Sequence, residues 1–523
     1  MWAQIVLGIF GVLAVGAVAV VIYDLMQSGH AVTRNFPIIG HLRYMLEGIG
    51  PELRQYIVTN NDAELPFSRD QRRWVYASAK GTNALFVFGT DNDIEHLDHY
   101  LIIKHAAFPL NAPLDEPSSP DPAVALPCAK LLGGSRGRAQ AFRAPSIVNI
   151  SGMSFGSLSA HAVEAMNRGA AEAGCLHNTG EGAISPHHLH GGDLIYQIGT
   201  SYFGCRDDRG HFDLARLVDR CQVNPVRAIE IKLSQGAKPG IGGLLPAAKV
   251  TPEIAQIRGI PVGVECRSPA AHSAFDSVDS MLDFVETLAD ATGLPVGIKS
   301  AVGEMAFWDE LAEAMATDRA RGVDFITVDG GEGGTGAAPL PFADHVAFPF
   351  KWAFATVYRA FAERSIQDAV VFIGSGKLGL PDNALLAMAL GCDMVNVGRE
   401  VMFAAGCIQS QRCHTGRCPT GVATQSQRLQ RGLVPEPKGH RVATYVAALR
   451  TELLRISRAC GHVHPGLVPP DALEILQTGY RAVSAQELFS YKEGWGVPSA
   501  DQQESLAACW PPLASTNLEP PGT

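Results

Sequence analysis

Short apolar runs alternate with amphipathic stretches of helical length from about residue 145 onward. Each run ends in glycine or polar residues, and the eight runs are SIVNISG (146–152), CLHNTG (175–180), AIEIKL (228–233), PVGVEC (261–266), PVGIKS (295–300), DFITVDGG (324–331), AVVFIGSG (369–376) and DMVNVGRE (393–400). Eight or nine such units over about 260 residues favour an α/β fold of the (β/α)8 TIM-barrel type over an open sheet. Because chemistry in such barrels gathers at the carboxyl ends of the strands, we expect the site there.

A different pattern occupies the N-terminus. Residues 3–23 (AQIVLGIFGVLAVGAVAVVIY) carry no charge, and Gln4 is their only strongly polar side chain. At about 1.5 Å per residue they can span a bilayer core of roughly 30 Å. The segment lacks a positive n-region and is long for an h-region, so we predict an uncleaved anchor, with a cleaved signal peptide as the alternative.

The charges near this segment predict its orientation. Arg34, Arg43 and Arg54 follow the apolar stretch and nothing basic precedes it. The positive-inside rule therefore predicts a single-pass protein of the cytoplasmic membrane, touching lipid through its N-terminal helix, with its catalytic domain facing the cytoplasm.

We divide the chain into four parts: a transmembrane anchor (1–24), a lead-in segment (25–100), the barrel (101–480) with a cysteine loop at 406–425, and a short C-terminal tail (481–523). The lead-in segment contains a basic stretch, SRDQRRWVYASAK (68–80), which could touch lipid headgroups but is more simply a solvated face. The tail ends in a proline-rich run (Pro511, Pro512, Pro520 and Pro521), and we expect it to be partly disordered.

Composition excludes some classes of function. The 523 residues carry a net charge of -10 and no dense block of Lys and Arg. Nucleic-acid binding depends on a basic surface, so it is not expected. Eight of the eleven cysteines are scattered singly. This is not the pattern of a disulfide framework, and a reducing compartment fits better.

The other three cysteines lie close together in the sequence. Cys407, Cys413 and Cys418 have five and four residues between them, in GCIQSQRCHTGRCPTGVATQ (406–425). Three thiolates at this spacing could converge on one iron-sulfur cluster of the three-iron type, [3Fe-4S], whereas a four-iron cluster needs a fourth ligand. A zinc site completed by His414, or plain structural thiols, is the alternative. A cluster would indicate electron chemistry.

Glycines gather after the last two predicted strands, in IGSGKLGLPDNALLAMALGCDMVNVGR (373–399). Barrels often bind a phosphate where these loops meet a short helix N-terminus, and backbone without side chains can approach it closely. A phosphate site beside a cluster indicates FMN, which exchanges single electrons with a cluster and a hydride with a substrate. We expect no built-in nicotinamide site, so electrons would come from another protein.

Together the motifs resemble one family. They are SGMSFGSLS (151–159), NTGEG (178–182), KLSQGAKPGIGGLLP (232–246), GGEGGTGAAP (330–339), GSGKLG (374–379) and CxxxxxCHTxxCPxGVATQ (407–425). In this order they resemble the FMN-binding synthase domain of glutamate synthases, particularly short single-module proteins with an N-terminal membrane segment. The resemblance extends from about Arg69 to Gln425 and on toward residue 480.

The resemblance implies a reaction. In this family 2-oxoglutarate and ammonia form an imine, and reduced FMN delivers hydride to its Cα to give L-glutamate. A three-iron cluster relays electrons to the flavin from ferredoxin or a reductase partner.

The resemblance also implies roles for particular residues. The isoalloxazine ring would be lined by Ser151, Met153 and Ser154, with Lys232 and Gln235 near its polar edge. The ribityl phosphate end would be held by Gly333, Gly334, Thr335, Gly374, Gly376, Gly398 and Arg399. Substrate contact and proton transfer fall to Glu181, Lys232 and Lys238, because a dianionic oxoacid needs cations and imine formation needs a general acid or base. Lys299 is a further candidate, for stabilising negative charge on reduced flavin.

Each of these residues has a plainer interpretation. Glu181 could cap a helix that begins near Pro186, Lys232 could be an ordinary strand-end lysine, and Lys238 could be a solvated loop lysine. Four histidines resemble metal ligands by number but lack a carboxylate to complete a set, so we interpret them as satisfied polar groups: His177, His187, His188 and His190.

One departure from the family pattern concerns the substrate. GIGGLLP places Leu244 where glutamate synthases usually have a polar residue that helps to hold the oxoacid. Losing a hydrogen-bond donor there costs about 1 to 3 kcal/mol if its partner stays buried and unpaired. Related imines, including one from methylamine that gives N-methylglutamate, are therefore alternative substrates, and a non-catalytic electron-transfer flavoprotein is an alternative function.

The large glutamate synthases begin with an amidotransferase whose first residue is a cysteine nucleophile. This chain opens with Met1-Trp2 and the apolar segment. Glutamine hydrolysis is therefore not expected, and ammonia would come free or from a separate amidotransferase.

Overall fold

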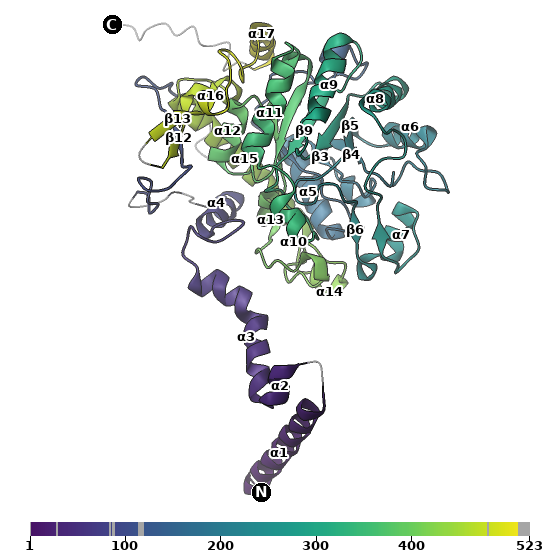
Figure 1. The fold of residues 1–523 in the computed structure, drawn as a ribbon, viewed down its shortest axis with the longest axis vertical. Helices are drawn as coiled ribbons and strands as arrows, with labels where there is room; N and C mark the ends of the chain where they lie inside the picture. Colours follow the sequence, from purple (N-terminus) through teal and green to yellow (C-terminus); the bar gives the residue numbers. More distant parts are fainter. Residues whose placement is uncertain are drawn as a thin grey trace. The chain divides into compact units, whose positions relative to one another are not determined.

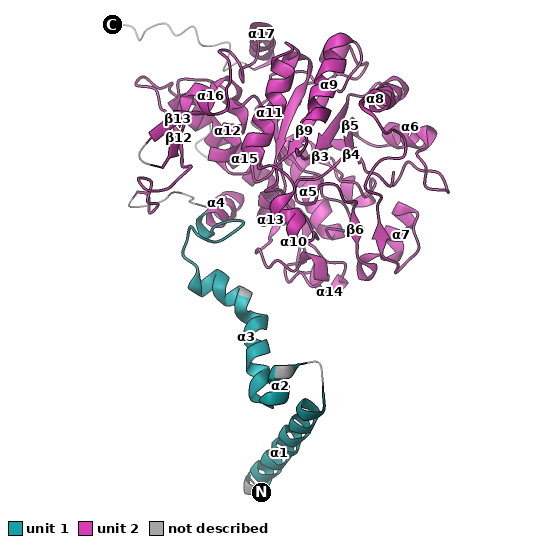
Figure 2. Ribbon diagram, in the orientation of Figure 1, with its two compact units in different colours: residues 1–70 teal, residues 71–523 magenta. Residues whose placement is uncertain are grey.

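The chain folds into two units, residues 1–70 and 71–523, each described here by itself (Figure 2). The structure is a computed structural model, and it describes residues 2–510 apart from 28–29, 83–84, 86–88, 113–119 and 479–480. The proline-rich end of the tail lies outside the described residues.

Eight parallel strands form a closed barrel in the larger unit (Figure 1). They are β2 (Val148–Ile150), β3 (His177–Asn178), β4 (Leu194–Ile198), β5 (Val226–Lys232), β8 (Val296–Ser300), β9 (Phe325–Asp329), β10 (Val371–Ser375) and β11 (Met394–Val397). Each strand pairs with the next in this order, and β11 closes the barrel on β2 with Val395 opposite Val148. The predicted TIM barrel is confirmed.

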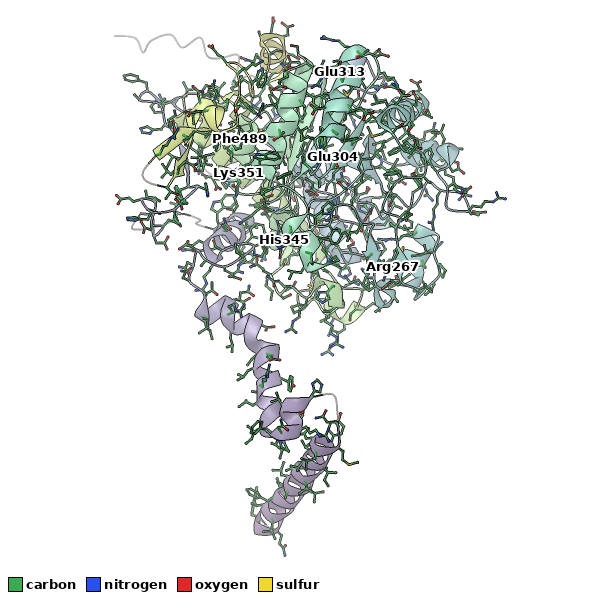
Figure 3. All side chains as sticks on the ribbon, viewed as in Figure 1. Arg267, Glu304, Glu313, His345, Lys351 and Phe489 are labelled. Carbon is green, nitrogen blue, oxygen red and sulfur yellow. The ribbon has the colours of Figure 1, made fainter. Side chains whose placement is uncertain are left out.

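One predicted strand is wrong and one strand was missed. The run at 261–266 is not part of the barrel: Val262 and Val264 are 57% and 53% exposed. Only its last residue enters a strand, β7 (Cys266–Arg267), which pairs antiparallel with β6 (Leu244–Leu245) outside the barrel. Figure 3 labels Arg267 on this hairpin. The barrel strand that the prediction lacked is β4, which lies between β3 and β5 and whose five residues are all buried.

Helices cover the barrel on its outside (Figure 1). Those after the first barrel strand are α5 (Ala160–Ala173), α6 (Leu214–Val223), α7 (Pro252–Arg258), α8 (Val278–Thr292), α9 (Ala306–Thr317), α10 (Leu340–His345), α11 (Phe350–Ala362), α12 (Pro381–Ala389), α13 (Arg399–Ala405), α14 (Gln427–Gln430), α15 (Pro435–Ala459), α16 (Ala485–Leu488) and α17 (Ala500–Cys509). In α8, Ser277 caps the first turn by accepting a hydrogen bond from the Ser280 amide at 3.2 Å. Gly293, at φ +72°, ends the helix. Buried apolar residues in between recur every three or four positions, which is the spacing that faces a helix toward a core: Val278, Met281, Leu282, Val285, Leu288 and Ala289.

A small sheet joins the two ends of the larger unit. It contains β1 (Leu101–Ile103), β12 (Leu473–Gln477) and β13 (Arg481–Ser484), all antiparallel. Residues near the start of the predicted barrel segment are thereby paired with residues near its end.

The inside of the barrel is apolar toward the amino ends of the strands. There a segment before β2 bridges back on itself between Leu132 and Phe142. These two side chains pack with core residues from five strands, including Ile195, Ala228 and Phe325. The amino-terminal end of the barrel is therefore filled with side chains.

The middle of the barrel is polar instead. The fully buried carboxylate of Glu230 accepts hydrogen bonds from Asn178 Nδ2 (2.7 Å), Gln197 Nε2 (2.6 Å) and Thr327 Oγ1 (2.6 Å). These residues come from strands β3, β4, β5 and β9, so one carboxylate links half of the barrel wall. The missed strand β4 carries the inward polar residue Gln197, just as the predicted strand β5 carries Glu230.

The smaller unit is helical. It contains α1 (Trp2–Met26), α2 (Ala31–Asn35), α3 (Ile39–Leu53) and a π-helical turn (Arg54–Val58), and α4 (Arg69–Ala79) begins at its end. Among the described residues, α1 provides one stretch long and apolar enough to cross a membrane, Gln4–Met26, with none of its most apolar window buried. A signal sequence shares this length and composition.

Replacing Glu230 tests the polar layer. Glu230→Leu leaves three buried donors unpaired, and each costs about 1 to 3 kcal/mol, so we expect the free energy of unfolding to fall by about 3 kcal/mol or more. Glu230→Gln keeps an acceptor and should cost less. Urea unfolding of the full chain, followed by circular dichroism, measures both. An equal midpoint for wild type and Glu230→Leu would contradict this view of the barrel interior.

Candidate active site

Two loops bring an ion pair together at the barrel mouth, by which we mean the carboxyl ends of the eight strands. Glu181 follows β3 and Lys232 ends β5, and Glu181 Oε1 lies 3.2 Å from Lys232 Nζ. Lys232 Nζ also donates a hydrogen bond to Gln235 Oε1 at 3.1 Å. Glu181 therefore does not cap the turn near Pro186: the helical turn Pro186–His188 is capped by Ser185.

The charges around this pair determine its protonation. Burial opposes ionisation of Glu181, but the cations of Lys232 and Lys238 hold the pKa of its carboxyl below the ordinary value. Burial, reinforced by the charge of Lys232, lowers the pKa of Lys238. Glu181 is thus held as a carboxylate, and Lys238 is poised to release a proton more readily than an ordinary lysine.

Two glycines leave room for the Glu181 side chain. A Cβ on Gly199 would lie 2.7 Å from Glu181 Oε2, and a Cβ on Gly243 would lie 2.6 Å from Oε1. Both separations are too short for a real side chain. Any other residue at either position would require the Glu181 side chain to shift.

A second ion pair lies within the barrel wall. Lys299 Nζ is 3.4 Å from Asp329 Oδ2, and both side chains are buried. Burial works against the ammonium, yet the carboxylates of Asp329 and Glu230 raise the pKa of Lys299. Asp329 Oδ2 also accepts a hydrogen bond from the Gly236 amide at 3.0 Å. Lys299 is therefore a protonated cation whose charge is partly balanced.

The QGAKPG loop is fastened to the GGEGG loop after β9. Gln235 Nε2 donates to the carbonyl oxygen of Gly334 at 2.7 Å. At Gly236 an added Cβ would overlap the carbonyl oxygen of Gly330, so only glycine permits this approach. Gln235 thus connects the Lys232 cluster with the glycine-rich loops.

The loops after β10 and β11 form a cradle of glycine and cations. Gly376 has φ +123°, and it lies close to Gly330. Arg399 follows Gly398 and donates a hydrogen bond to the carbonyl oxygen of Glu332. A Cβ on Gly334 would come within 2.8 Å of Arg399 Cδ.

Lys377 is a second cation in this cradle. Burial, followed by the positive charge of Arg399, lowers the pKa of Lys377. The two side chains therefore lie near enough to interact electrostatically.

The loop after β2 completes the mouth. The Ser151 amide donates to the Val397 carbonyl at 2.9 Å. A Cβ on Gly398 would lie 3.7 Å from Ser151 Cβ and 4.0 Å from Met153 Sδ. At Gly180, φ +65°, a Cβ would lie 2.6 Å from the Ser154 amide. The first and last strands of the barrel thus present Ser151, Met153 and Gly398 side by side.

The three clustered cysteines also lie near one another. Burial raises the pKa of Cys407 to about 12, and charge on Cys413 and Cys418 acts in the same direction. For Cys418, hydrogen bonds from the backbone around Ala423 overcome burial and lower the pKa. Backbone donors around a sulfur favour a thiolate, which is the form that binds metal.

The geometry of this loop differs from that of a single-ion site. In the described part of the chain, no trio of ligand atoms that includes a cysteine lies within 4.8 Å of one another. Tetrahedral zinc would hold its sulfur atoms roughly 3.8 Å apart, given Zn–S bonds of about 2.3 Å. At least one pair of the three sulfur atoms is therefore farther apart than in a tetrahedral zinc site.

Sequence comparison identifies the family. The model for the conserved region in glutamate synthase matches residues 137–463. The glutamate synthase large subunit-like protein YerD of Bacillus subtilis is 37% identical over 485 residues, covering 87% of this chain and 92% of YerD. The chain belongs to the glutamate synthase family. The predicted resemblance, and with it an oxidoreductase family, is confirmed.

Other relatives match over less of their length. The archaeal-type glutamate synthase (NADPH) of Thermotoga neapolitana is 36% identical over 350 residues, 66% of this chain and 64% of that enzyme. Among solved structures, a double mutant of flavocytochrome b2 with pyruvate bound aligns over 96% of both chains at 13% identity and a TM-score of 0.44.

The structure brings most of the predicted glutamate synthase residues to one end of the barrel. Glu181, Lys232, Gln235 and Lys238 form one cluster, and Lys299 lies in the wall beneath. Ser151, Met153 and Ser154 follow β2. The remaining predicted residues lie at the ends of β9, β10 and β11: Gly333, Gly334 and Thr335 on the loop after β9, Gly374 within β10, Gly376 directly after it, and Gly398 and Arg399 at the start of α13. The cysteine trio belongs to the segment that follows α13.

Sequence reasoning missed two cations. Lys377 stands inside the recognised GSGKLG motif but was not singled out, although a lysine between glycines of a phosphate loop is a usable signal. Arg258 ends α7 and has no motif of its own. It is buried and donates to the Phe155 carbonyl at 2.8 Å, and its charge also acts on Glu181.

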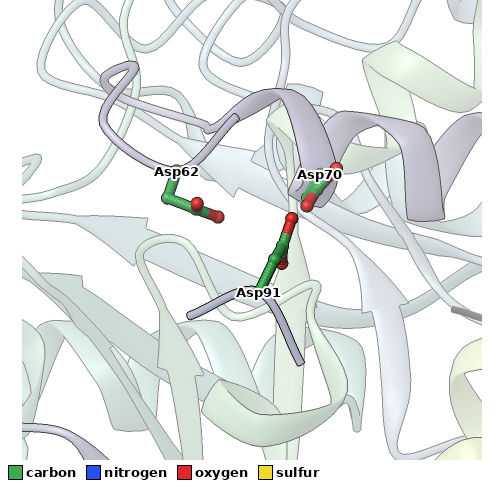
Figure 4. A group of neighbouring side chains, drawn as sticks. All are labelled: Asp62, Asp70 and Asp91. Atoms are coloured by element: carbon green, nitrogen blue, oxygen red, sulfur yellow. The ribbon is translucent and has the colours of Figure 1, made fainter. Parts of the chain in front are cut away.

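The four histidines do not converge on one site. His187 Nε2 lies 2.8 Å from Glu253 Oε1, and His190 Nδ1 lies 3.8 Å from Glu164 Oε1. His188 Nδ1 accepts from Ser185, and His177 Nδ1 lies 3.3 Å from Asn167 Nδ2. Burial lowers the pKa of His177 to about 3. Figure 4 draws three aspartates, of which Asp62 and Asp70 belong to the smaller unit and Asp91 to the larger.

The loop of the three cysteines is fastened to the loop after β2. Gln425 Nε2 donates to the carbonyl oxygens of Gly156 (3.1 Å) and Leu158 (2.8 Å). The Ser159 amide donates to Val422 O at 2.9 Å. Lys249, a buried cation whose charge acts on Cys413 and Cys418, donates to Ser157 O at 3.1 Å. The cysteine loop and the barrel mouth are therefore one connected structure.

The Glu181 ion pair predicts a pH dependence of stability. Because the folded-state pKa of Glu181 is lowered, its contribution is full above the ordinary value of 4.5 and is lost as the pH falls through the folded value. We expect the melting temperatures of wild type and Glu181→Gln to differ at neutral pH and to converge in acid. The matched control is Glu304→Gln, which removes an exposed carboxylate (Figure 3). A difference that grew as the pH fell would contradict the ion pair.

Proposed function

We propose that this protein is a glutamate synthase-type oxidoreductase that reductively aminates 2-oxoglutarate, through 2-iminoglutarate, to L-glutamate. FMN and a [3Fe-4S] cluster are its cofactors, and its electrons come from an external donor. The observation that carries the proposal is the Glu181–Lys232–Lys238 cluster, which shares one barrel mouth with a glycine-rich cradle.

The cradle fits FMN in charge. At Gly236, Gly330 and Gly334 an added Cβ would meet neighbouring protein atoms, so glycine allows the loops of the cradle to pack closely against one another. Lys377 and Arg399 would neutralise the phosphate, and Ser151, Met153 and Ser154 would line the ring. Bound FMN would supply hydride to the imine carbon and exchange single electrons with the cluster.

The cations of the mouth fit a dianionic oxoacid. Lys232, Lys238 and the buried Arg258 surround Glu181, so the local charge is positive before substrate binds. A carboxylate of the substrate would pair with these cations, and hydrogen bonds to charged groups are worth about 1.5 to 3 kcal/mol each. The cluster would thereby fix the orientation of the bound oxoacid.

Proton transfer falls to Lys238. Imine formation requires a proton on the departing carbonyl oxygen, and burial lowers the pKa of Lys238 toward the working pH. Glu181 stays ionised and holds Lys232 in place. Lys299 would stabilise negative charge near the ring, with Asp329 fixing its position.

The cysteine loop fits a cluster because three sulfurs with backbone donors occupy a loop fastened to the β2 loop. Cys407, Cys413 and Cys418 would be its ligands. The names of archaeal-type relatives specify NADPH. The GxGxxG matches of this chain, at 331–336 and 374–379, lie at the ends of barrel strands and belong to the proposed FMN cradle. We therefore propose a ferredoxin or a separate reductase as electron donor, and free ammonia or a separate amidotransferase as nitrogen source.

Leu244 favours a second candidate substrate. Leu244 is 37% exposed on β6. It follows Gly243, where an added Cβ would lie 2.6 Å from Glu181 Oε1. An apolar residue at this position suits a more apolar amine, so N-methylglutamate formation from methylamine is the alternative reaction. Comparing ammonia with methylamine as nitrogen donor decides between them. A non-catalytic electron-transfer flavoprotein would convert neither ammonia nor methylamine into product.

We further propose that α1 anchors the protein in the cytoplasmic membrane, with the barrel facing the cytoplasm. The uncharged stretch from Gln4 and the arginines that follow it support this orientation. The proposed divisions remain an anchor at 1–24, a lead-in segment at 25–100, the barrel at 101–480 and a tail at 481–523.

Gly243→Ala tests the catalytic cluster. The new Cβ displaces the Glu181 carboxylate from Lys232, and a misplacement of about 1 Å can cost 10²-fold in rate. We therefore expect about a hundredfold lower kcat/KM for reductive amination with FMN still bound. Gly303→Ala is the matched control, because its Cβ would have no neighbour closer than 3.8 Å. Equal rates for the two variants would sink the proposed role of Glu181.

Cys418→Ser tests the cluster. We expect loss of iron and of the paramagnetic signal of an oxidised three-iron cluster, with FMN retained and turnover from the external donor abolished. Cys509→Ser, at an exposed cysteine, is the control. One equivalent of zinc and no iron in the wild-type protein would overturn the cluster assignment.

A further inference from the structure

Helix α3 carries a continuous apolar stripe. Its members recur every three or four residues along fifteen positions and are exposed, from 38% at Leu53 to 74% at Ile39: Ile39, Leu42, Met45, Leu46, Ile49 and Leu53. Arg43 lies at the margin of this stripe and Glu47 farther around the helix, and the two pair with each other at 2.8 Å. A helix with this division is amphipathic, and its apolar side requires a cover.

A clasp ties the start of α3 to the end of α1. Asp24, near the end of α1, is fully buried. Its Oδ2 accepts a hydrogen bond from the Ile38 amide at 3.0 Å, and its Oδ1 lies 2.9 Å from His41 Nε2. Gln27 stabilises the intervening turn by accepting from the His30 amide at 2.7 Å. Wherever the end of α1 lies, the first turn of α3 lies within hydrogen-bonding distance of it.

The proposed anchor fixes where that end lies. The apolar stretch Gln4–Met26 has 23 residues. At about 1.5 Å per residue it is roughly 35 Å long, somewhat more than a bilayer core of roughly 30 Å. A buried carboxylate one turn from its end therefore belongs at the membrane surface, and the clasp holds the start of α3 at the same depth.

We propose that α3 lies in the plane of the cytoplasmic membrane surface, with its apolar stripe inserted at the boundary of headgroups and acyl chains. The inference rests on the proposed anchor and extends it, because α1 alone would leave α3 in water. Lipid is the occupant that the clasp favours, since it places the stripe beside a bilayer. Such helices bury their apolar face about 5 to 10 Å into this boundary. Arg43 and Arg54 would then meet the headgroups.

Site-specific photocrosslinking of the full chain tests this. Benzoylphenylalanine replaces Leu46 on the stripe, Glu47 farther around the helix, or Val12 inside α1. Each variant is reconstituted in vesicles of phosphatidylcholine and phosphatidylglycerol and irradiated, and lipid adducts are measured by mass spectrometry. Circular dichroism checks that the variants are folded.

We expect lipid adducts at Leu46 and Val12 and at least fivefold fewer at Glu47. If Val12 gives lipid adducts but Leu46 crosslinks to the barrel or to a second copy, or gives none, the inference about α3 is overturned while the anchor stands. If Val12 gives no lipid adduct, the anchor fails, and this inference fails with it.

Discussion

A carboxylate can lie inside a barrel only when the surrounding strands satisfy it, and the barrel of this protein depends on that constraint. Glu230 takes donors from three other strands, so β3, β4, β5 and β9 are held in one register. Its charge also helps to keep Lys299 protonated one layer higher. The strands therefore supply the polar side chains in the upper half of the barrel. The loops that follow these strands begin from fixed positions.

Glycines allow the loops at the barrel mouth to approach one another closely. Glu181 reaches Lys232 because Gly199 and Gly243 leave it room, and the QGAKPG loop meets the loop after β9 because Gly236 has no side chain. Gln235 then connects the charged cluster to the glycine cradle. Gln425 connects the cysteine loop to the loop after β2. Substrate, flavin and cluster sites would thus share one network of short contacts, as electron transfer into an oxoacid site requires.

Periodicity predicted the barrel because seven of its eight strands overlap the predicted apolar runs, even where a run carries an inward polar residue such as Glu230. It missed β4 and failed at 261–266, where apolar residues are exposed near a hairpin. The motifs predicted the clustered residues at the mouth, since each motif follows a strand. Arg258 could not be found this way, because its role arises from contacts with residues about a hundred positions away in the sequence. The clasp between Asp24 and His41 is likewise a tertiary contact that no local pattern reveals.

The central claim is that the barrel mouth aminates an oxoacid with electrons stored in the protein. Its most direct test is anaerobic turnover of the purified, chemically reduced protein with ammonia and 2-oxoglutarate, following flavin reoxidation optically and product by mass spectrometry. The account predicts reoxidation together with formation of L-glutamate. Intact flavin and cluster spectra without reoxidation would contradict it.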